Sequence, residues 1–346
     1  MSLIQHLLGI ELPVIQAPMA GVQLSAMTIA VSQAGGLGSL PCAMLGVDAL
    51  RAELSAISAK TRQPYNVNFF AHVAPTPSDA REAQWRDTLA PYYREFDIDA
   101  TSISAGAPRH PFNAEYAALL SEFKPPVISF HFGLPSPELL TTVKSWGAKV
   151  LSTATTVDEA LWLQQRGVDA IIAQGVEAGG HRGLFLSDEL TTQIGTFSLL
   201  PQIVRAVNVP VIAAGGIADR AGVRAALSLG AAAVQIGTSY LLCDEATTSK
   251  VHRAALLSVA ARHTALTNVF TGRPARGIVN RVMREIGPIN SSAPEFPLAT
   301  TAITPLRAKA ESQGSGDFSP LWAGQNVSGC RAVSAAVLTR ELAGVS

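Results

Sequence analysis

The sequence predicts an α/β protein folded as a (β/α)8 TIM barrel. Short apolar, β-branched runs recur along the 346 residues, and each is followed by a helical pattern. Several runs are apolar throughout, which is typical of strands buried on both faces of a parallel sheet. Runs that start at 14 and 37, 127 and 149, 149 and 170, and 209 and 232 lie 21 to 23 residues apart. This spacing suits one strand, one helix and two short loops, although a doubly wound open sheet is the alternative.

Eight runs supply the expected strands, and they span residues 14–17, 37–40, 65–70, 127–132, 149–153, 170–174, 209–214 and 232–237. The gap after the third strand (71–125) is punctuated by proline and is interpreted as an insertion. A strand-like run at 101–105 is assigned to that insertion. A second long gap, after the sixth strand, holds a glycine-rich loop before a helix at 197–206.

The chain beyond the eighth strand predicts a helical excursion. Patterns rich in Ala and Leu follow residue 240, then a stretch punctuated by proline, and an amphipathic helix at 329–343 comes last. We therefore expect one domain formed by the barrel of residues 1–240, with 71–125 as an insertion, and completed by 329–346. Residues 241–328 would form a helical substrate or lid region over the barrel mouth.

Composition excludes several classes of protein. The 26 basic and 26 acidic residues balance, without a basic run, which argues against nucleic acid and anionic membranes as partners. An apolar content of 48% is too high for a disordered chain. The three cysteines are widely spaced and predict neither a disulfide framework nor a zinc site. Without a signal-peptide pattern or a membrane-length apolar run, the protein is expected in the cytoplasm.

Candidate ligand-binding residues lie where the predicted strands end, because TIM barrels build their sites there. After the first strand, small residues around Met19 and Ala20 let a flat ligand approach the main chain, although an ordinary turn is the simpler reading. Strands seven and eight end in two glycine loops, whose members are Gly215, Gly216, Gln235, Ile236, Gly237 and Thr238. Backbone N–H groups of two such neighbouring loops predict a cradle for a phosphate-bearing ligand.

Two histidines are the candidates for proton transfer. His181 follows Gly179 and Gly180 in a loop that holds four glycines within residues 175–183, and its ordinary pKa lies near neutrality. His131 ends the fourth strand on the face opposite Phe130, so it faces either the barrel interior or the helix layer. A surface histidine and a buried structural histidine are the respective alternatives. On the third strand, Asn66 and Asn68 share a face and need polar partners if that face is buried.

Other chemistries lack their residues. No lysine ends a predicted strand, which argues against Schiff-base chemistry, and no Gly-x-Ser-x-Gly elbow is present. Cys243 lies after the eighth strand, away from the sixth loop. Glu177, His181 and His131 could together approach a metal, but the glycine pair between the first two prevents the helix that such spacing needs. No metal is expected.

Five motifs carry a family resemblance: QAPMAG at 16–21, SFHFG at 129–133, QGVEAGGHRG at 174–183, PVIAAGGIAD at 210–219 and VQIGTSYL at 234–241. Together they resemble the nitronate monooxygenase family, formerly called 2-nitropropane dioxygenases, and within it the bacterial class I members. The motifs occur in order and span nearly the whole predicted barrel. The pair formed by SFHFG and the EAGGH portion of the third motif is the most specific.

The resemblance implies a (β/α)8 flavoprotein that holds FMN without a covalent bond. Its implied FMN contacts are Asn68, Gln174, Gly179, Gly216, Gln235, Ile236, Gly237 and Thr238, and Met19, Ala20, Gly180 and Gly215 complete the predicted set. The family's active-site histidine falls on His181, with His131 as a second catalytic candidate. No motif of residues 290–325 could be matched to substrate groups of the family.

The implied reaction is the oxidation of alkyl nitronates, notably propionate 3-nitronate, by O2. It proceeds through a flavin semiquinone and gives a carbonyl product and nitrite or a related nitrogen oxide. An FMN-dependent NAD(P)H reductase of quinones or enoyl thioesters is the alternative, because relatives of this fold use similar glycine loops. A phosphate-binding module without catalysis is a third reading, which a histidine at the same mouth disfavours. A small nitronate or nitroalkane and O2 are the expected partners, and a homodimer stays open.

Overall fold

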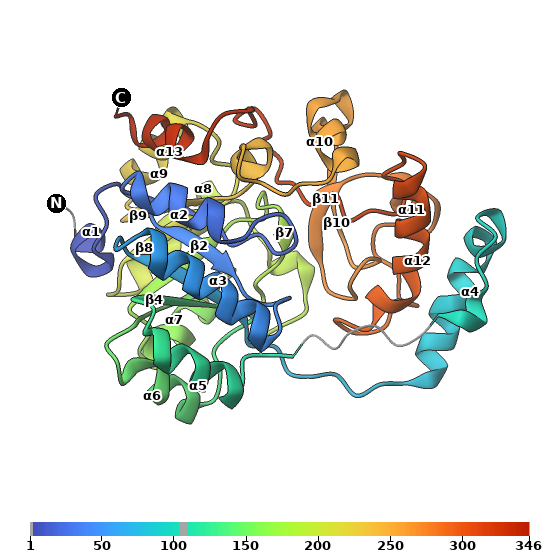
Figure 1. Ribbon diagram of the computed structural model, residues 1–346, viewed down its shortest axis with the longest axis horizontal. Helices are drawn as coiled ribbons and strands as arrows, with labels where there is room; N and C mark the ends of the chain where they lie inside the picture. The colour runs from blue at the N-terminus through green and yellow to red at the C-terminus, as the bar shows by residue number, and fades with distance from the viewer. Residues whose placement is uncertain (1–2, 104–109, 346) are drawn as a thin grey trace.

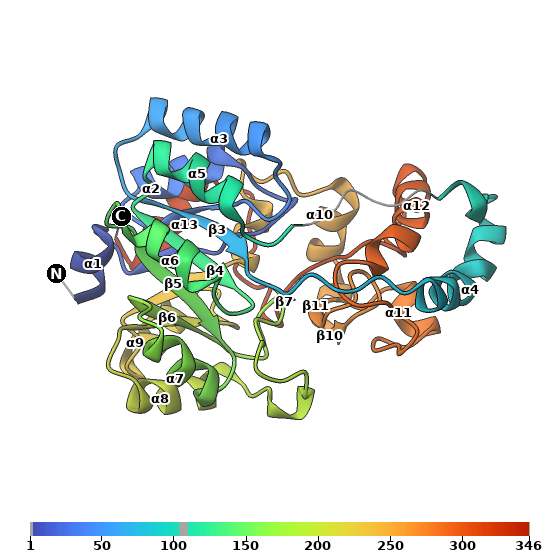
Figure 2. The same ribbon diagram turned by 90° about the horizontal axis from the view of Figure 1, so that it is seen from below.

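The computed structural model describes residues 3–103 and 110–345, and its main body is a barrel of eight parallel strands (Figures 1 and 2). Its strands are β1 (Val14–Gln16), β2 (Gly38–Pro41), β3 (Tyr65–Phe70), β4 (Val127–His131), β5 (Lys149–Ala154), β6 (Ala170–Gln174), β8 (Val211–Ala214) and β9 (Ala233–Ile236). They pair in the order β1-β9-β8-β6-β5-β4-β3-β2. A parallel bridge between Ile15 and Leu37 joins the two ends of this order. The predicted (β/α)8 barrel is confirmed, and the open sheet is wrong.

Helices surround the barrel in the expected alternation. Those that follow its strands are α2 (Ser25–Gln33), α3 (Val47–Lys60), α5 (Ala114–Phe123), α6 (Pro137–Lys144), α7 (Val157–Gln165), α8 (Thr196–Ala206), α9 (Arg220–Ser228) and α13 (Ala335–Ala343). The short α1 (Leu3–Leu8) precedes β1. No helix of the described residues is long and apolar enough to cross a membrane. Of the strand-like run at 101–105, residues 104 and 105 lie outside the described part, and Ala100–Ser102 forms a 3-10 helix.

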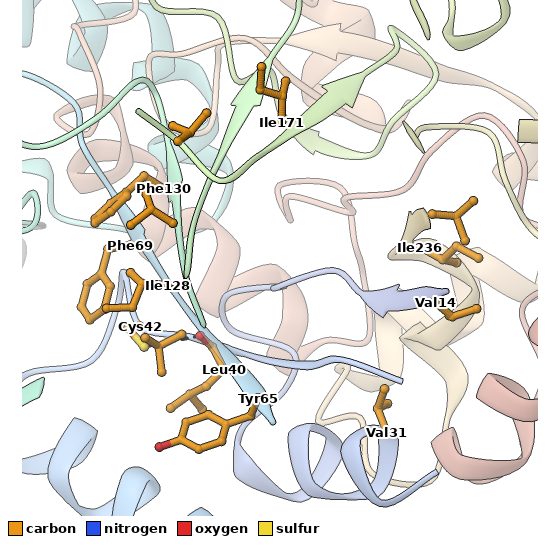
Figure 3. Close-up of a cluster of buried hydrophobic side chains, with 14 of the residues drawn as sticks. Val14, Val31, Leu40, Cys42, Tyr65, Phe69, Ile128, Phe130, Ile171 and Ile236 are labelled. Atoms are coloured by element: carbon orange, nitrogen blue, oxygen red, sulfur yellow. Dashed lines mark hydrogen bonds between the residues drawn. The ribbon is translucent and has the colours of Figure 1, made fainter. Parts of the chain in front are cut away.

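The largest apolar core lies between the strands and these helices. Outward-facing side chains from consecutive strands pack there, among them Phe69 of β3 and Phe130 of β4 (Figure 3). The opposite face of the same strands points into the barrel, where Asn66 donates to the hydroxyls of Ser39 at 3.0 Å and Ser129 at 2.9 Å. Alternation therefore assigns His131, two residues after Ser129, to the interior face at the barrel mouth.

A second group of elements, here called the cap (residues 79–95 and 250–322), lies beyond the carboxyl ends of the strands (Figure 2). It contains α4 (Asp79–Glu95), α10 (Lys250–Leu257), the 3-10 helix η4 (Val259–Arg262), β10 (Thr264–Thr267), β11 (Ala275–Ile278), α11 (Arg281–Glu285) and α12 (Ala299–Ser312). Helix α4 comes from the predicted insertion, and it packs against α12. Trp85 donates to the carbonyl of Ala299 at 3.1 Å and Tyr93 to that of Ala302 at 2.7 Å.

The sequence analysis expected residues 241–328 to be helical. The structure shows that this part of the chain also contains strands. Strands β10 and β11 form an antiparallel sheet with the short β7 (Gly180–His181), which belongs to the loop after β6. Each of these strands has at most four residues, too few for period-two alternation to be recognised. The expected boundaries between barrel and lid region stay a prediction.

The start of β2 offers a direct test of this packing. A Cβ added to Gly38 would lie 2.0 Å from the carbonyl oxygen of Thr28 in α2, so Gly38→Ala must displace backbone. We expect a loss of about 1–3 kcal/mol in the free energy of unfolding, or more, measured by urea denaturation. Gly222→Ala, inside α9 and with only ordinary contacts, is the control and should be neutral or slightly stabilising. Equal stabilities of the two variants would contradict this packing.

Candidate active site

A cavity of about 310 Å³ lies between the barrel mouth and the cap. All the residues that the sequence analysis selected for the site line it: Met19, Ala20, Asn68, His131, Gln174, Gly179, Gly180, His181, Gly215, Gly216, Gln235, Ile236, Gly237 and Thr238. The structure therefore brings together the ends of six strands and the loop after β6.

The loops after β8 and β9 form a backbone cradle on one side of the cavity. Gly215 and Gly216 have φ angles of 119° and 72°, in the left-handed region that favours glycine. The backbone N–H groups of Gly216 and Gly237 donate to no other group among residues 3–103 and 110–345. The hydroxyl of Thr238 accepts from the N–H of Gly324 at 2.9 Å, so its own proton remains for an acceptor in the cavity.

A segment that returns from the cap completes this side of the cavity. The side chain of Asn326 donates to the carbonyl of Gly216 at 3.0 Å, and the N–H of Gln325 donates to that of Glu177 at 3.0 Å. Gly324 lies so close that a Cβ on Gly179 would be 2.5 Å from its nitrogen. The sequence analysis missed Gly324 and Asn326, because only long-range packing brings them to the glycine loops.

The loop after β6 is held by a buried arginine. The guanidinium of Arg182, which is inaccessible to solvent, donates to the carbonyls of Gly175 at 2.7 Å and Gln174 at 2.6 Å and to the side-chain oxygen of Gln193 at 3.0 Å. Burial lowers the pKa of Arg182 to about 9, which leaves it charged at neutral pH. Three acceptors thus fix the position at which the loop leaves the strand.

Glu177 has a structural partner in the same loop. Its carboxylate accepts from the backbone N–H of Thr196 at 2.9 Å and from the hydroxyl of that residue at 2.8 Å, at the start of α8. A carboxylate at a helix N-terminus satisfies N–H groups that lack partners within the helix.

The described residues contain no group of three or more side chains that could hold a metal ion.

His131 is held as a neutral ring. Its Nε2 lies 3.1 Å from the backbone oxygen of His181, which only accepts, so Nε2 carries the proton. Its Nδ1 then accepts from the hydroxyl of Thr153 at 3.1 Å. Burial, helped by the positive charges of Arg273 and Arg182, lowers the pKa of His131 to about 3. The ring therefore positions the backbone of His181 and stays uncharged above pH 4.

His181 belongs to β7 rather than to an irregular loop. Its backbone lies opposite Ala275 of β11, and its Nε2 lies 2.9 Å from the hydroxyl of Thr271. Aromatic side chains surround the ring: Phe70, Phe132, Phe296 and Trp322 have ring centroids 5.3 to 6.1 Å from its own. Two of these four, Phe296 and Trp322, come from the cap, where the sequence analysis matched no motif.

The three side-chain amides that line the cavity have different partners. The side chain of Gln174 donates to the carbonyl of His181 at 3.0 Å and accepts from the N–H of Gly183 at 2.8 Å, so it holds the loop. Asn68 donates to the hydroxyl of Ser129 at 2.9 Å. Gln235, in contrast, has a buried Oε1 without a partner in the described chain. A buried acceptor on a cavity wall indicates a ligand that supplies the donor.

Comparisons with known proteins agree with this geometry. Residues 1–344 match the model of the nitronate monooxygenase family. The chain belongs to this family. It is 40% identical to the nitronate monooxygenase of Paraburkholderia phytofirmans over 97% of this chain and 92% of that protein. It is also 40% identical to the Pseudomonas aeruginosa nitronate monooxygenase, over 97% of each.

Solved structures extend the comparison. A nitroalkane oxidase from Streptomyces ansochromogenes superposes with a TM-score of 0.87 at 37% identity, covering 98% of this chain and 96% of that one. FabK from Thermotoga maritima gives a TM-score of 0.74 at 28% identity, over 99% of this chain and 94% of that one. These relatives show that the chain is an oxidoreductase of the nitronate monooxygenase type, which confirms the predicted family and enzyme class.

The neutral state of His131 predicts a pH dependence of stability. In the unfolded chain His131 is protonated with a pKa near 6.5, whereas in the folded protein its pKa is about 3. The stabilisation that comes from the neutral ring is therefore complete above pH 6.5 and declines as the pH falls toward 3. Between pH 7 and pH 5, the wild type should lose about 2 kcal/mol more than His131→Asn. His252 titrates in both proteins and cancels. Urea unfolding at the two pH values measures the difference, and parallel losses would contradict it.

Proposed function

We propose that this protein is an FMN-dependent enzyme that oxidises alkyl nitronates with O2, yielding a carbonyl compound and nitrite or a related nitrogen oxide. Membership of the family supports the oxidation of nitronates. The observation that carries the proposal is the position of His181, which lines the same cavity as the glycine cradle of β8 and β9. Groups suited to anchor a phosphate and to transfer a proton thus line the same cavity.

The cavity fits FMN in its donor and acceptor groups. The free N–H groups of Gly216 and Gly237, with the hydroxyl of Thr238, suit a phosphate. The orphaned oxygen of Gln235 suits an N–H at the edge of the flavin ring. Side chains at Gly215 and Gly216 would be strained by positive φ angles. When bound, FMN would supply the redox chemistry that links the substrate to O2.

The protein's own residues orient the substrate and exclude water. His181 would hydrogen-bond the nitronate oxygens, and with a neutral nitroalkane it would remove the proton on the carbon that carries nitrogen. The surrounding aromatic rings keep water from this position and strengthen that hydrogen bond. His131 keeps its proton on Nε2, and it therefore fixes the main chain of His181 instead of accepting a proton.

The identity of the cofactor is tested by its release. We expect the purified protein to be yellow and to release FMN, not FAD, on denaturation, because the described cavity has one phosphate cradle and no second one for an adenylate. Chromatography of the supernatant distinguishes the two flavins. A colourless protein that cannot be reconstituted with FMN would contradict the proposal.

The electron donor separates the proposed function from the reductase alternative. Mixed with the protein without oxygen, propionate 3-nitronate should change the flavin absorbance within seconds, whereas NADH or NADPH should leave it unchanged. Stopped-flow spectroscopy records both. Rapid full bleaching by a nicotinamide together with no response to the nitronate would assign the protein to the reductases instead.

His181→Asn tests the proton-transfer role. The variant should retain flavin and lose roughly 10²–10⁴-fold in turnover of a neutral nitroalkane, since that reaction requires removal of a proton. With the preformed nitronate the loss should be smaller. His263→Asn, at an exposed position outside the cavity, is the matched control. Negligible and equal losses on both substrates would show that His181 takes no part in the reaction.

A further inference from the structure

One turn of the cap reaches the ring of His181. Residues 268–272 connect β10 to β11, and the hydroxyl of Thr271 in this turn lies 2.9 Å from Nε2 of His181. Thr271 is buried and lines the same cavity as the histidine. None of the roles described above uses this hydroxyl.

The position of Thr271 is set by the cap and not by His181. The carbonyl of the preceding residue, Phe270, accepts from the hydroxyl of Thr300 in α12 at 3.1 Å. The following residue, Gly272, has a φ angle of 91°, and a Cβ there would overlap the carbonyl oxygen of Pro294. Contacts on both sides of Thr271 therefore fix the main chain that carries its hydroxyl.

The main chain of His181 is held without the help of Thr271. Its carbonyl accepts from Nε2 of His131 at 3.1 Å and from the side chain of Gln174 at 3.0 Å. With its backbone fixed, an imidazole can still turn about the bond to its ring, a torsion with broad minima. The contact with Thr271 selects one of these orientations.

The direction of the hydroxyl assigns the protonated nitrogen of His181. The hydroxyl of Thr271 donates to the carbonyl of Arg273 at 3.4 Å, within the same turn. A hydroxyl has one proton and two lone pairs, so its lone pairs are left for Nε2 of His181. Nε2 then carries the proton of the neutral ring, and Nδ1 carries the basic lone pair.

We infer that Thr271 is a positioning residue, which accepts a hydrogen bond from Nε2 of His181 and keeps Nδ1 unprotonated as the base toward a neutral nitroalkane. The inference rests on the proposed function and adds a residue of the cap to it. In the step concerned, the C–H bond next to the nitro group breaks and an Nδ1–H bond forms. The electron pair stays with the substrate as the nitronate, and the ring becomes an imidazolium. Thr271 stabilises this cation, because a charged donor makes the stronger hydrogen bond.

The elements packed around His181 carry other charged or titratable groups. On the barrel side and in the segment that leads into β11, they are His72, His131, Glu177, Arg182, Arg273 and Arg276. In the cap, Glu295 pairs with Arg81 at 3.6 Å, and His252 donates to the carbonyl of Trp322 at 3.1 Å. A substitution of Thr271 alters none of these groups, so a change in the titration of His181 reports the lost hydroxyl.

The first test is the pH profile of kcat/KM for 1-nitropropane on the holoenzyme. Thr271→Val removes the hydroxyl at nearly constant volume and should lower kcat/KM about 10- to 100-fold, as expected for a hydrogen bond to a charged group. Its acid limb should move to lower pH by about one unit, because the imidazolium has lost its acceptor. Thr271→Ser keeps the hydroxyl and should restore both values.

The matched control is Thr267→Val, which alters a buried threonine at the end of β10, outside the cavity. It should leave the acid limb at the pH of the wild type. A merely structural role of Thr271 would lower kcat/KM without moving this limb. That result, or a serine variant that behaves like the valine variant, overturns the inference.

Nitrogen-15 NMR of the histidine rings provides a readout without turnover. The signals of His181 are those that disappear in His181→Asn. In the wild type above its pKa, Nε2 should carry the proton and Nδ1 should not, and a proton on Nδ1 overturns the inference. A wild type with the proton on Nε2 that oxidises neither nitroalkane nor nitronate contradicts the proposed function alone, so the two failures are distinguishable.

Discussion

The return of the chain after β6 is the constraint on which the site depends. The buried guanidinium of Arg182 donates to the carbonyls of Gln174 and Gly175, where the chain leaves β6, and the loop then pairs with β11 as β7. These contacts set the position of His181 between the barrel and the cap. Removing a buried charge's partners is costly, so the chain has little freedom to leave this path. The cavity between barrel and cap exists because the same loop belongs to both.

The two histidines near this loop differ in what they can do. The backbone oxygen of His181 accepts from the side chains of both His131 and Gln174. These two side chains at the barrel mouth therefore hold the main chain of His181 in place. Burial keeps the ring of His131 neutral, although the hydrogen bond that it donates acts in the opposite direction and raises its pKa. The ring of His181 faces aromatic walls instead. Under the proposed function, His131 supports the loop and His181 takes part in the chemistry, so the loss of either should affect activity by a different route.

Much of the barrel could be predicted from the sequence, because strands buried on both faces give short apolar runs at a regular spacing. The glycine loops were predictable for a related reason, since parallel strands end at one edge and bring their loops together. The interior position of His131 required the closed barrel, and β10 and β11 were too short for their pattern to be read. Asn326, Thr271 and the docking of α4 on α12 depend on contacts between residues far apart in sequence. No local pattern encodes such contacts.

The central claim is that one cavity holds a phosphate at the glycine loops and presents His181 to the ring that the phosphate anchors. A crystal structure of the protein with FMN tests this most directly. The account predicts phosphate oxygens within hydrogen-bond distance of the N–H groups of Gly216 and Gly237, and His181 over one face of the ring. A phosphate bound away from these glycine loops, or a ring that lies away from His181, would contradict it.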